Sequence, residues 1–378
     1  MRVERQASAL PAAPVLVPLG SLVAAGLFGA LLLAVTGHDP LHIYAEIAAA
    51  GFLAPGALQA TLVSSAPLLL ASLAAATAFR IRLWNIGGEG QLYLGSVGAL
   101  GVALLMGDRF GVLVVPAMML AGAATGAAWA LVPALLRAFL KTNEIITTLM
   151  LNYLGGLLIA YLIYDSGSFW RDLSSASAKV FPTGKHLEGP ALWPVLEIPG
   201  TGVAAPLGFL AGALLAVVVW LLFRSTTAGF QARVVGDSPA TATYAGISVR
   251  RTVVTVMCLS GALAGLAGAS DSGDFRHALD PAGMQASGFG YSGIVVAALA
   301  RYNSLAVVPV ALLVGGLYSA SYSIAGSDLP SGLVGVLQGV ILFFVVAGEA
   351  VAGYRLGWGR RPAPARVGAP ADAPAESL

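Results

Sequence analysis

Apolar runs of roughly 20 residues recur along the whole chain, and no other feature constrains its fold as strongly. An α-helix rises about 1.5 Å per residue, so each run is long enough to cross the hydrocarbon core of a bilayer, which is about 30 Å thick. Only 10% of the residues are charged, whereas soluble domains carry about 25%. Because such a chain has too little polar surface to face water, the sequence predicts an all-α, polytopic transmembrane helical bundle.

The apolar runs predict about ten membrane spans. Their approximate bounds are 14–37, 57–79, 84–107, 112–135, 144–164, 206–223, 252–270, 284–300, 305–324 and 332–352. The eighth run is rich in glycine, and only residues 288–300 have a firmly helical pattern, which is too short to cross the core. We therefore expect a broken or half-inserted helix there, with its loose backbone covered by protein or lining a water-filled cavity.

Lysine and arginine residues give an independent test of this topology, because cytoplasmic loops of membrane proteins are enriched in both. With both termini in the cytoplasm, 15 of the 20 Lys and Arg residues fall on the inside. The chain then forms one membrane domain, residues 1–361, and a disordered Ala/Pro-rich cytoplasmic tail, residues 362–378. Two loops are long, an outer loop at about 165–205 and a cytoplasmic loop at about 224–251.

The segment LWNIGGEGQLYLGSVGAL places Asn85, Glu89 and Gln91 at or just inside the membrane. A carboxylate in a spanning helix costs about 2.5–3.5 kcal/mol on insertion scales, so it must face the bundle interior or water. Asn85 and Glu89 are four residues apart and would share one face of a helix. All three side chains are therefore candidates for a translocation path. In the alternative, Glu89 lies at the cytoplasmic edge, pairs with Arg80 or Arg82, and only stabilises the fold.

The segment TNEIITTLMLNYLGG carries a second group of polar residues. Glu144, Thr148 and Asn152 follow one another at intervals of four residues, so they form one polar stripe on an otherwise apolar helix. Glu144 also suits the positive N-terminal end of that helix. The stripe either lines a translocation path or forms hydrogen bonds between helices, and the sequence leaves both interpretations open.

The cytoplasmic loop contains a predicted short helix at about 239–245. Ser238 followed by Pro239 is a typical N-cap and first helical residue, and Gly246 is a typical stop. A helix this short is unstable alone and needs a partner surface, and its small residues suit docking into a groove. The residues expected at that surface are Ser238, Pro239, Ala240, Ala242, Tyr244, Ala245 and Gly246.

Motifs for covalent or metal chemistry are absent from the sequence. It has no G-x-x-x-x-G-K-[ST] ATP site, no G-x-S-x-G, H-E-x-x-H or C-x-x-C motif, and no basic cluster typical of a nucleic-acid site. We expect Asp271, Asp274, Arg276 and His277 to form a solvated outer face. These absences argue against an enzyme, and we expect no metal or cofactor to be bound by this chain.

Three segments resemble the permease subunits of bacterial ABC importers in the ribose and branched-chain amino acid permease superfamily. They are NIGGEGQ at 85–91, NEIITTLMLNY at 143–153 and GDSPATATYAGI at 236–247. All three are similar to the branch that imports nucleosides and simple sugars with a basic-membrane-protein-type binding lipoprotein. The resemblance extends from about residue 55 to about residue 350.

This resemblance implies an alternating-access permease in the bacterial inner membrane that takes up nucleosides, purine nucleosides above all, or related simple sugars. ATP and Mg²⁺ would be bound by a separate cytoplasmic ATPase, and an external solute-binding lipoprotein would deliver the solute. A second, homologous permease would complete the pore, and the long outer loop favours a heterodimer. The helix at 239–245 would be the coupling helix that docks into the ATPase. The family's loop usually has an asparagine where this chain has Asp237 or Ser238, a change that preserves the N-cap chemistry.

A secondary transporter driven by protons or sodium ions is the alternative, with Glu89 and Glu144 as the ion-linked acids. The missing ATP motif fits both functions. The capped cytoplasmic helix favours the importer, because a secondary transporter needs no docking element at that position.

Overall fold

A computed structural model of the protein describes residues 2–5, 13–174, 176–198, 200, 202–324 and parts of 336–357. Seven helices within these residues are long and apolar enough to cross a membrane. The predicted all-α transmembrane bundle is therefore confirmed.

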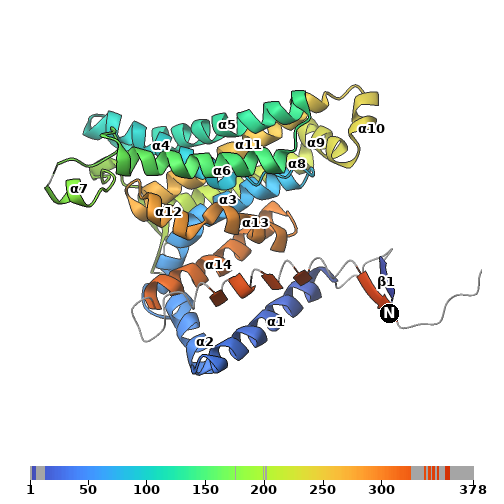
Figure 1. The fold of residues 1–378 in the computed structure, drawn as a ribbon, viewed down its shortest axis with the longest axis horizontal. Helices are drawn as coiled ribbons and strands as arrows, with labels where there is room; N and C mark the ends of the chain where they lie inside the picture. Colours follow the sequence, from blue (N-terminus) through green and yellow to red (C-terminus); the bar gives the residue numbers. More distant parts are fainter. Residues whose placement is uncertain are drawn as a thin grey trace, which may run out of the picture.

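The long helices form the bundle that Figure 1 shows, and the first of them lies apart from the others, beyond the last. They are α1 (Ala13–Val35), α3 (Ala57–Phe79), α4 (Gly88–Met106), α5 (Val114–Leu140), α6 (Glu144–Ala160), α8 (Leu207–Ser225), α11 (Val249–Ser270) and α14 (Ser304–Ile324). The shorter α-helices are α2 (Pro40–Ala48), α7 (Ala176–Val180), α9 (Thr227–Asp237), α10 (Pro239–Tyr244), α12 (Pro281–Ser287) and α13 (Phe289–Leu299). Short 3₁₀ and π segments are η1 (Ala49–Leu53), η2 (Gly107–Leu113), η3 (Tyr161–Asp165), η4 (Gly189–Ala191) and η5 (Asp271–Arg276).

Within the part of the chain that the structure describes, four short strands form two antiparallel pairs. In the outer loop, β2 (Val195–Ile198) pairs with β3 (Val203–Pro206). Near the two ends of the chain, β1 (Arg2–Arg5) pairs with β4 (Tyr354–Gly357). The second pair brings the N-terminal and C-terminal segments together, at the same end of the molecule as α10 (Figure 1).

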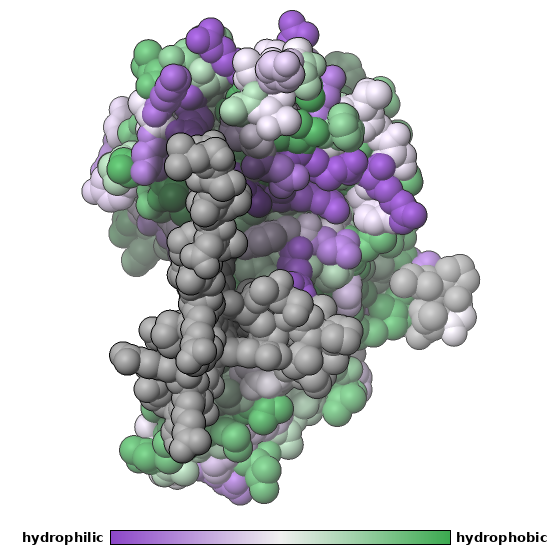
Figure 2. All heavy atoms as spheres, turned by 90° about the vertical axis from the view of Figure 1, so that its right-hand side faces the viewer, coloured by the Kyte–Doolittle hydropathy of each residue, from purple (hydrophilic) through white to green (hydrophobic). Residues whose placement is uncertain are grey.

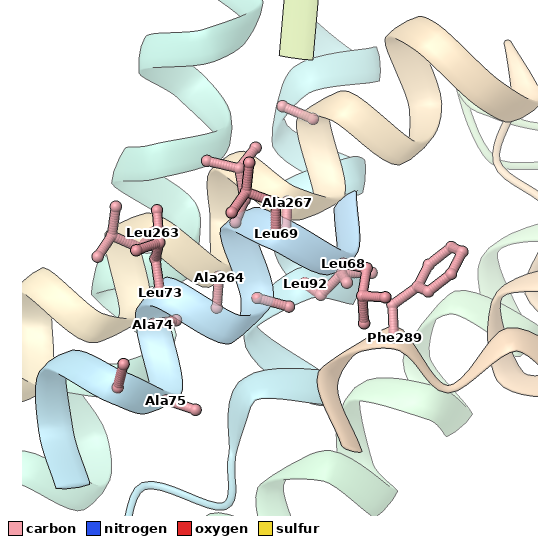
Figure 3. Close-up of a cluster of buried hydrophobic side chains, with 14 of the residues drawn as sticks. Leu68, Leu69, Leu73, Ala74, Ala75, Leu92, Leu263, Ala264, Ala267 and Phe289 are labelled. Atoms are coloured by element: carbon pink, nitrogen blue, oxygen red, sulfur yellow. The ribbon is translucent and has the colours of Figure 1, made fainter. Parts of the chain in front are cut away.

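Helix α3 forms the centre of the core. It packs against α8, α11, α13 and α14, and 94% of its most apolar stretch is buried. Figure 3 shows leucine and alanine side chains of α3 beside Leu92 of α4, Leu263 and Ala264 of α11, and Phe289 of α13. The sequence of α3 is apolar on all sides, which is typical of a helix buried on all sides.

Glycines bring α4, α5 and α11 into close contact. A Cβ atom at Gly95 of α4 would overlap the backbone of Gly265 in α11, and a Cβ atom at Gly265 would overlap the carbonyl of Gly122 in α5. Apolar side chains give no hydrophobic driving force between helices in lipid, so close backbone packing of small residues holds such helices together. These three helices therefore form a tightly packed layer beside α3.

The eighth predicted span is broken, as expected. Asp280 caps α12 by accepting a hydrogen bond from the Gly283 N–H at 3.1 Å, and Pro281 is the first helical residue. Gly288 has a φ of +55° and separates α12 from α13. Helix α13 has 11 residues and extends roughly 16 Å, so it does not cross the hydrocarbon core by itself.

Parts of the predicted topology are not tested by the structure. The run at 14–37 is mostly helical as α1, and most of the run at 332–352 lies outside the described residues. The tail 362–378 also lies outside them. The total of ten spans and the cytoplasmic position of both termini therefore stay predictions.

The expectation of a solvated outer face at residues 271–277 is wrong. Asp271 is fully buried, and Arg276, 10% exposed, donates to it at 3.1 Å. The outer loop covers these residues, because the Trp193 N–H donates to Gly273 O and the Leu187 N–H donates to His277 O. The polar side chains of this segment therefore include a buried ion pair, Arg276 with Asp271, rather than a set of groups that face water.

Candidate functional site

Asn85 lies in the turn before α4 rather than on the helix. Its Oδ1 accepts hydrogen bonds from the Gly87 N–H at 3.1 Å and from Gln91 Nε2 at 2.9 Å. Its Nδ2 donates to Gln91 Oε1 at 3.0 Å and to Ser260 Oγ on α11 at 2.9 Å. The expectation that Asn85 shares a helix face with Glu89 is wrong, because α4 begins only at Gly88. Asn85 and Gln91 bind one another and attach the start of α4 to α11.

Glu89 lies in the first turn of α4 and is 2% exposed. Its Oε2 accepts hydrogen bonds from the Gly290 N–H at 2.7 Å and from the Tyr291 N–H at 3.2 Å. These two groups belong to the first turn of α13, whose N–H groups have no partner within their own helix. The Glu89 carboxylate therefore caps the half-helix α13, and its negative charge suits the positive end of that helix.

The alternative pairing of Glu89 with a nearby arginine is not observed. Arg82 forms its ion pair with Asp237 at 3.7 Å, and the Arg80 guanidinium lies over the Phe223 ring. Glu89 therefore points into the bundle, toward α13.

The polar stripe on α6 is buried against α4, and its three residues share one face as predicted. Glu144 pairs with Arg137 of α5 at 3.2 Å, and Thr148 Oγ1 donates to the Glu144 carbonyl at 2.7 Å. Asn152 Oδ1 accepts from the Gly90 N–H at 2.8 Å. These contacts hold α5, α6 and the start of α4 together. Of the two interpretations that the sequence left open for the stripe, they fit hydrogen bonding between helices.

Asn152 also connects α6 to the two segments that Glu89 joins. Its Nδ2 donates to the Ile86 carbonyl at 2.7 Å and to the Tyr291 hydroxyl at 3.2 Å. The turn before α4, helix α6 and the start of α13 therefore meet at one buried asparagine.

A cavity of about 320 Å³ opens where these elements meet, a volume at the lower end of the range for ligand pockets. Its polar lining consists of Glu89, Tyr93, Asn152, Tyr153, Gln285 and Tyr291. Of the predicted path residues, only Glu89 and Asn152 line it; Asn85, Gln91, Glu144 and Thr148 form contacts within the bundle instead.

The Glu89 carboxylate gives this cavity one buried acidic group in its lining. Oε1 is buried and accepts no hydrogen bond of normal geometry from the described residues, although the Tyr93 hydroxyl lies close enough to interact with the carboxylate. The rings of Tyr153, 70% exposed, and Tyr291, 46% exposed, contribute flat apolar surfaces to the same cavity. The cavity can therefore offer a charged acceptor and aromatic faces to one small polar molecule.

Four lining residues were missed by the sequence reasoning. Tyr93 is four residues after Glu89 and therefore shares its helix face, and Tyr153 follows Asn152 directly. Those two positions could have been found from spacing. Gln285 and Tyr291 come from the broken helix, and only the fold brings them to the cavity.

The predicted cytoplasmic helix is present as α10. Ser238 caps it by accepting a hydrogen bond from the Thr241 N–H at 3.2 Å, and Gly246 follows with a φ of +76°. The helix ends at Tyr244, one residue before the predicted end. Tyr244 is 96% exposed, whereas Ala242 is fully buried against the protein itself.

Of the residues predicted for this surface, Ser238 is half-buried, whereas Pro239, Ala240, Tyr244, Ala245 and Gly246 are exposed, as are Thr241 and Thr243. Ala242 is not part of that surface, because it faces the bundle and fixes the position of the helix.

The family of permease components of branched-chain amino acid transport systems matches residues 57–346. The chain belongs to this family. The permease is therefore a transport component rather than an enzyme, and its apolar helices make it a multi-pass membrane protein. Family membership argues against the ion-coupled secondary transporter. No solved structure matches the permease significantly.

Curated relatives match the permease over most of its length. The guanosine ABC transporter permease protein NupP of Bacillus subtilis is 33% identical over 339 residues, 89% of this chain and 94% of that protein. The nucleoside ABC transporter permease protein NupB of Lactococcus lactis is 28% identical over 334 residues, 88% of this chain and 90% of that protein. The glucose ABC transporter permease protein TsgB13 of Haloferax volcanii is 31% identical over 358 residues, 90% and 89% of the two chains.

Such relatives occur in pairs. Bacillus subtilis has a second guanosine permease protein, NupQ, and Lactococcus lactis has a second nucleoside permease protein, NupC, and both are also similar to this chain.

Proposed function

We propose that the permease is one of two different pore subunits of an ABC importer in a bacterial inner membrane, and that the importer takes up nucleosides, purine nucleosides above all, or related simple sugars. Support comes from the relatives, which are named as guanosine, nucleoside and glucose permeases. Their occurrence in pairs supports a heterodimer.

The cavity beside Glu89 is the structural observation from which we infer the class of solute. A nucleoside has hydroxyl and N–H donors together with a flat aromatic base. The Glu89 carboxylate and the Gln285 amide line the cavity and can hydrogen-bond to such donors, and the tyrosine rings can stack on a base. A free sugar would use the carboxylate and the Gln285 amide but would gain less from the rings.

The proposed mechanism is alternating access driven from the cytoplasm. A separate ATPase binds ATP and Mg²⁺, and α10 docks into it through Pro239, Ala240, Tyr244 and Ala245. An external lipoprotein delivers the solute. Helix α10 packs against α9 and α11, so we propose that a movement of α10 is transmitted to the bundle through these two helices.

The test is uptake of radiolabelled guanosine, adenosine and ribose by cells with and without the gene. Each uptake is measured with arsenate, which depletes ATP, and with an uncoupler, which dissipates ion gradients. We expect nucleoside uptake to require the gene, to be lost with arsenate, and to survive the uncoupler while ATP is maintained. Gene-dependent uptake that only the uncoupler abolishes would contradict the ATP-driven importer, and uptake of ribose alone would contradict the preference for nucleosides.

A further inference from the structure

A second cavity, of about 540 Å³, lies between α10 and the ends of three long apolar helices. Its walls come from the turn after α3, the end of α5, the end of α9, the start of α11, and α10 itself. These helix ends mark the boundary between the apolar bundle and the loop that carries α10. The cavity therefore lies at the level of the lipid headgroups on the α10 side.

Four cationic side chains line this cavity, namely Arg82, Arg137, Lys141 and Arg250. Arg82 pairs with Asp237 and Arg137 pairs with Glu144. The Lys141 side chain forms no ion pair or hydrogen bond with the described residues, and that of Arg250 has only a ring contact with Phe139. Two cations therefore face the cavity without an acidic partner among the described residues.

Figure 2 views the molecule from the α10 end and shows hydrophilic residues gathered there. Arg82 and Lys141 also adopt positive φ values, 58° and 55°. Lys141 is the C-cap residue of α5, where a left-handed residue commonly ends a helix. Both cations therefore lie in turns at the rim of one cavity.

The floor of the cavity is apolar. Ile81 and Leu83 come from the turn after α3, Val235 from α9, and Val249 and Val253 from α11. A soluble anion such as inorganic phosphate would leave this floor uncovered. A molecule with an anionic head and an apolar tail would satisfy both parts.

We propose that this cavity binds the phosphate group of an anionic phospholipid from the cytoplasmic leaflet, with Lys141 and Arg250 as the principal contacts. Basic pockets between membrane helices on the cytoplasmic side bind such headgroups. The bound lipid lies against Pro239, Ala240 and Thr243 of α10. It therefore connects the membrane surface to the helix that we propose to dock into the ATPase, although lipid binding itself does not depend on that proposed function.

The test is native mass spectrometry of the full-length permease in mild detergent, titrated with phosphatidylglycerol, phosphatidylcholine or inorganic phosphate. The test variant is Lys141→Gln with Arg250→Gln. The matched control is Arg251→Gln, which removes the neighbouring cation on α11, a side chain that lines a different cavity. We expect the double variant to bind phosphatidylglycerol at least about tenfold more weakly, because two charge-assisted contacts are lost. The control should bind as the wild type does.

A second variant keeps the test valid if the double variant folds poorly. Ala240 lines the cavity, so Ala240→Phe narrows it without changing charge and should reduce phosphatidylglycerol binding similarly. Undiminished binding by a folded test variant, equal weakening by Arg251→Gln, or equal binding of phosphatidylcholine would overturn the lipid site. Competition by inorganic phosphate at low concentration would assign the cavity to a soluble anion instead and would also overturn it.

Discussion

The two oxygens of the Glu89 carboxylate have different surroundings, and this difference governs what the residue can do. Oε2 is committed to the N-terminus of α13, whereas Oε1 is buried beside the cavity without a hydrogen bond of normal geometry from the described residues. One side chain therefore has a structural contact with α13 through Oε2, and under the proposed function its second oxygen is the one that would interact with a solute.

Replacing Glu89 by glutamine separates these two roles. The amide oxygen of the introduced side chain can still accept one N–H bond from α13, but a neutral oxygen binds a solute donor less strongly. A hydrogen bond to a charged group contributes about 1.5–3 kcal/mol, so we expect Glu89→Gln to raise the KM of guanosine uptake roughly tenfold or more. Uptake kinetics at matched membrane levels measure this. Glu197→Gln in the exposed hairpin is the control, and an unchanged KM in Glu89→Gln would exclude the carboxylate from solute binding.

Asn152 is a structural residue at the edge of the same cavity. In Asn152→Ala the Gly90 N–H and the Ile86 carbonyl lose their partners. Each unpaired buried group costs about 1–3 kcal/mol, so we expect a lower thermal unfolding midpoint in detergent. Thr147→Ala, whose hydroxyl bonds among the described residues only to its own helix and its cap, should change the midpoint little. Equal midpoints for both variants would show that Asn152 does not hold these helices together.

Helix α10 is the element where sequence and structure agree most closely. Cap and stop residues act locally, so Ser238, Pro239 and Gly246 could predict the helix without knowledge of the fold. Asn85 could not be placed in this way, because the start of α4 depends on contacts with α11 and α6. The burial of Asp271 also depends on the outer loop, which is distant in the sequence, so the residues near Asp271 could not predict it.

A bulky charge on the outward side of α10 should separate ATP hydrolysis from transport. Ala245 is exposed, so Ala245→Arg leaves the fold of the permease intact but obstructs a docking partner. We expect most guanosine uptake to be lost while the permease is still inserted and the ATPase subunit still hydrolyses ATP. Ala245→Ser, which keeps a small side chain, should transport normally. Normal transport by Ala245→Arg at normal expression would refute the coupling role.

At the scale of the whole molecule, the general architecture follows from composition, whereas the packing does not. Long apolar runs are enough to predict an all-α membrane bundle, and glycine enrichment predicts the break near Gly288. Which glycines meet across α4, α5 and α11 is visible only in the fold. The cavity beside Glu89 is also visible only there, since its lining comes from α4, α6, α12 and α13.

The close layer of α4, α5 and α11 should be sensitive to a single added side chain. In Gly265→Val the branched side chain would overlap the backbone of α5, and no flexible side chain is there to move aside. We expect little monodisperse protein after extraction and size-exclusion chromatography. Gly26→Ala in α1, where an added Cβ meets no neighbour, is the control. A normal elution profile for Gly265→Val would show that the layer tolerates separation.

The cap that Glu89 places on α13 has a thermodynamic consequence for transport. Under the proposed function, a solute that hydrogen-bonds to the Glu89 carboxylate would share the group that holds the half-helix, so occupancy of the cavity and the position of α13 would be linked. Linkage is reciprocal: if displacement of α13 changes the solute affinity by a given factor, the bound solute changes the equilibrium of that displacement by the same factor. The permease can thereby report an occupied site to a neighbouring helix without any additional sensor.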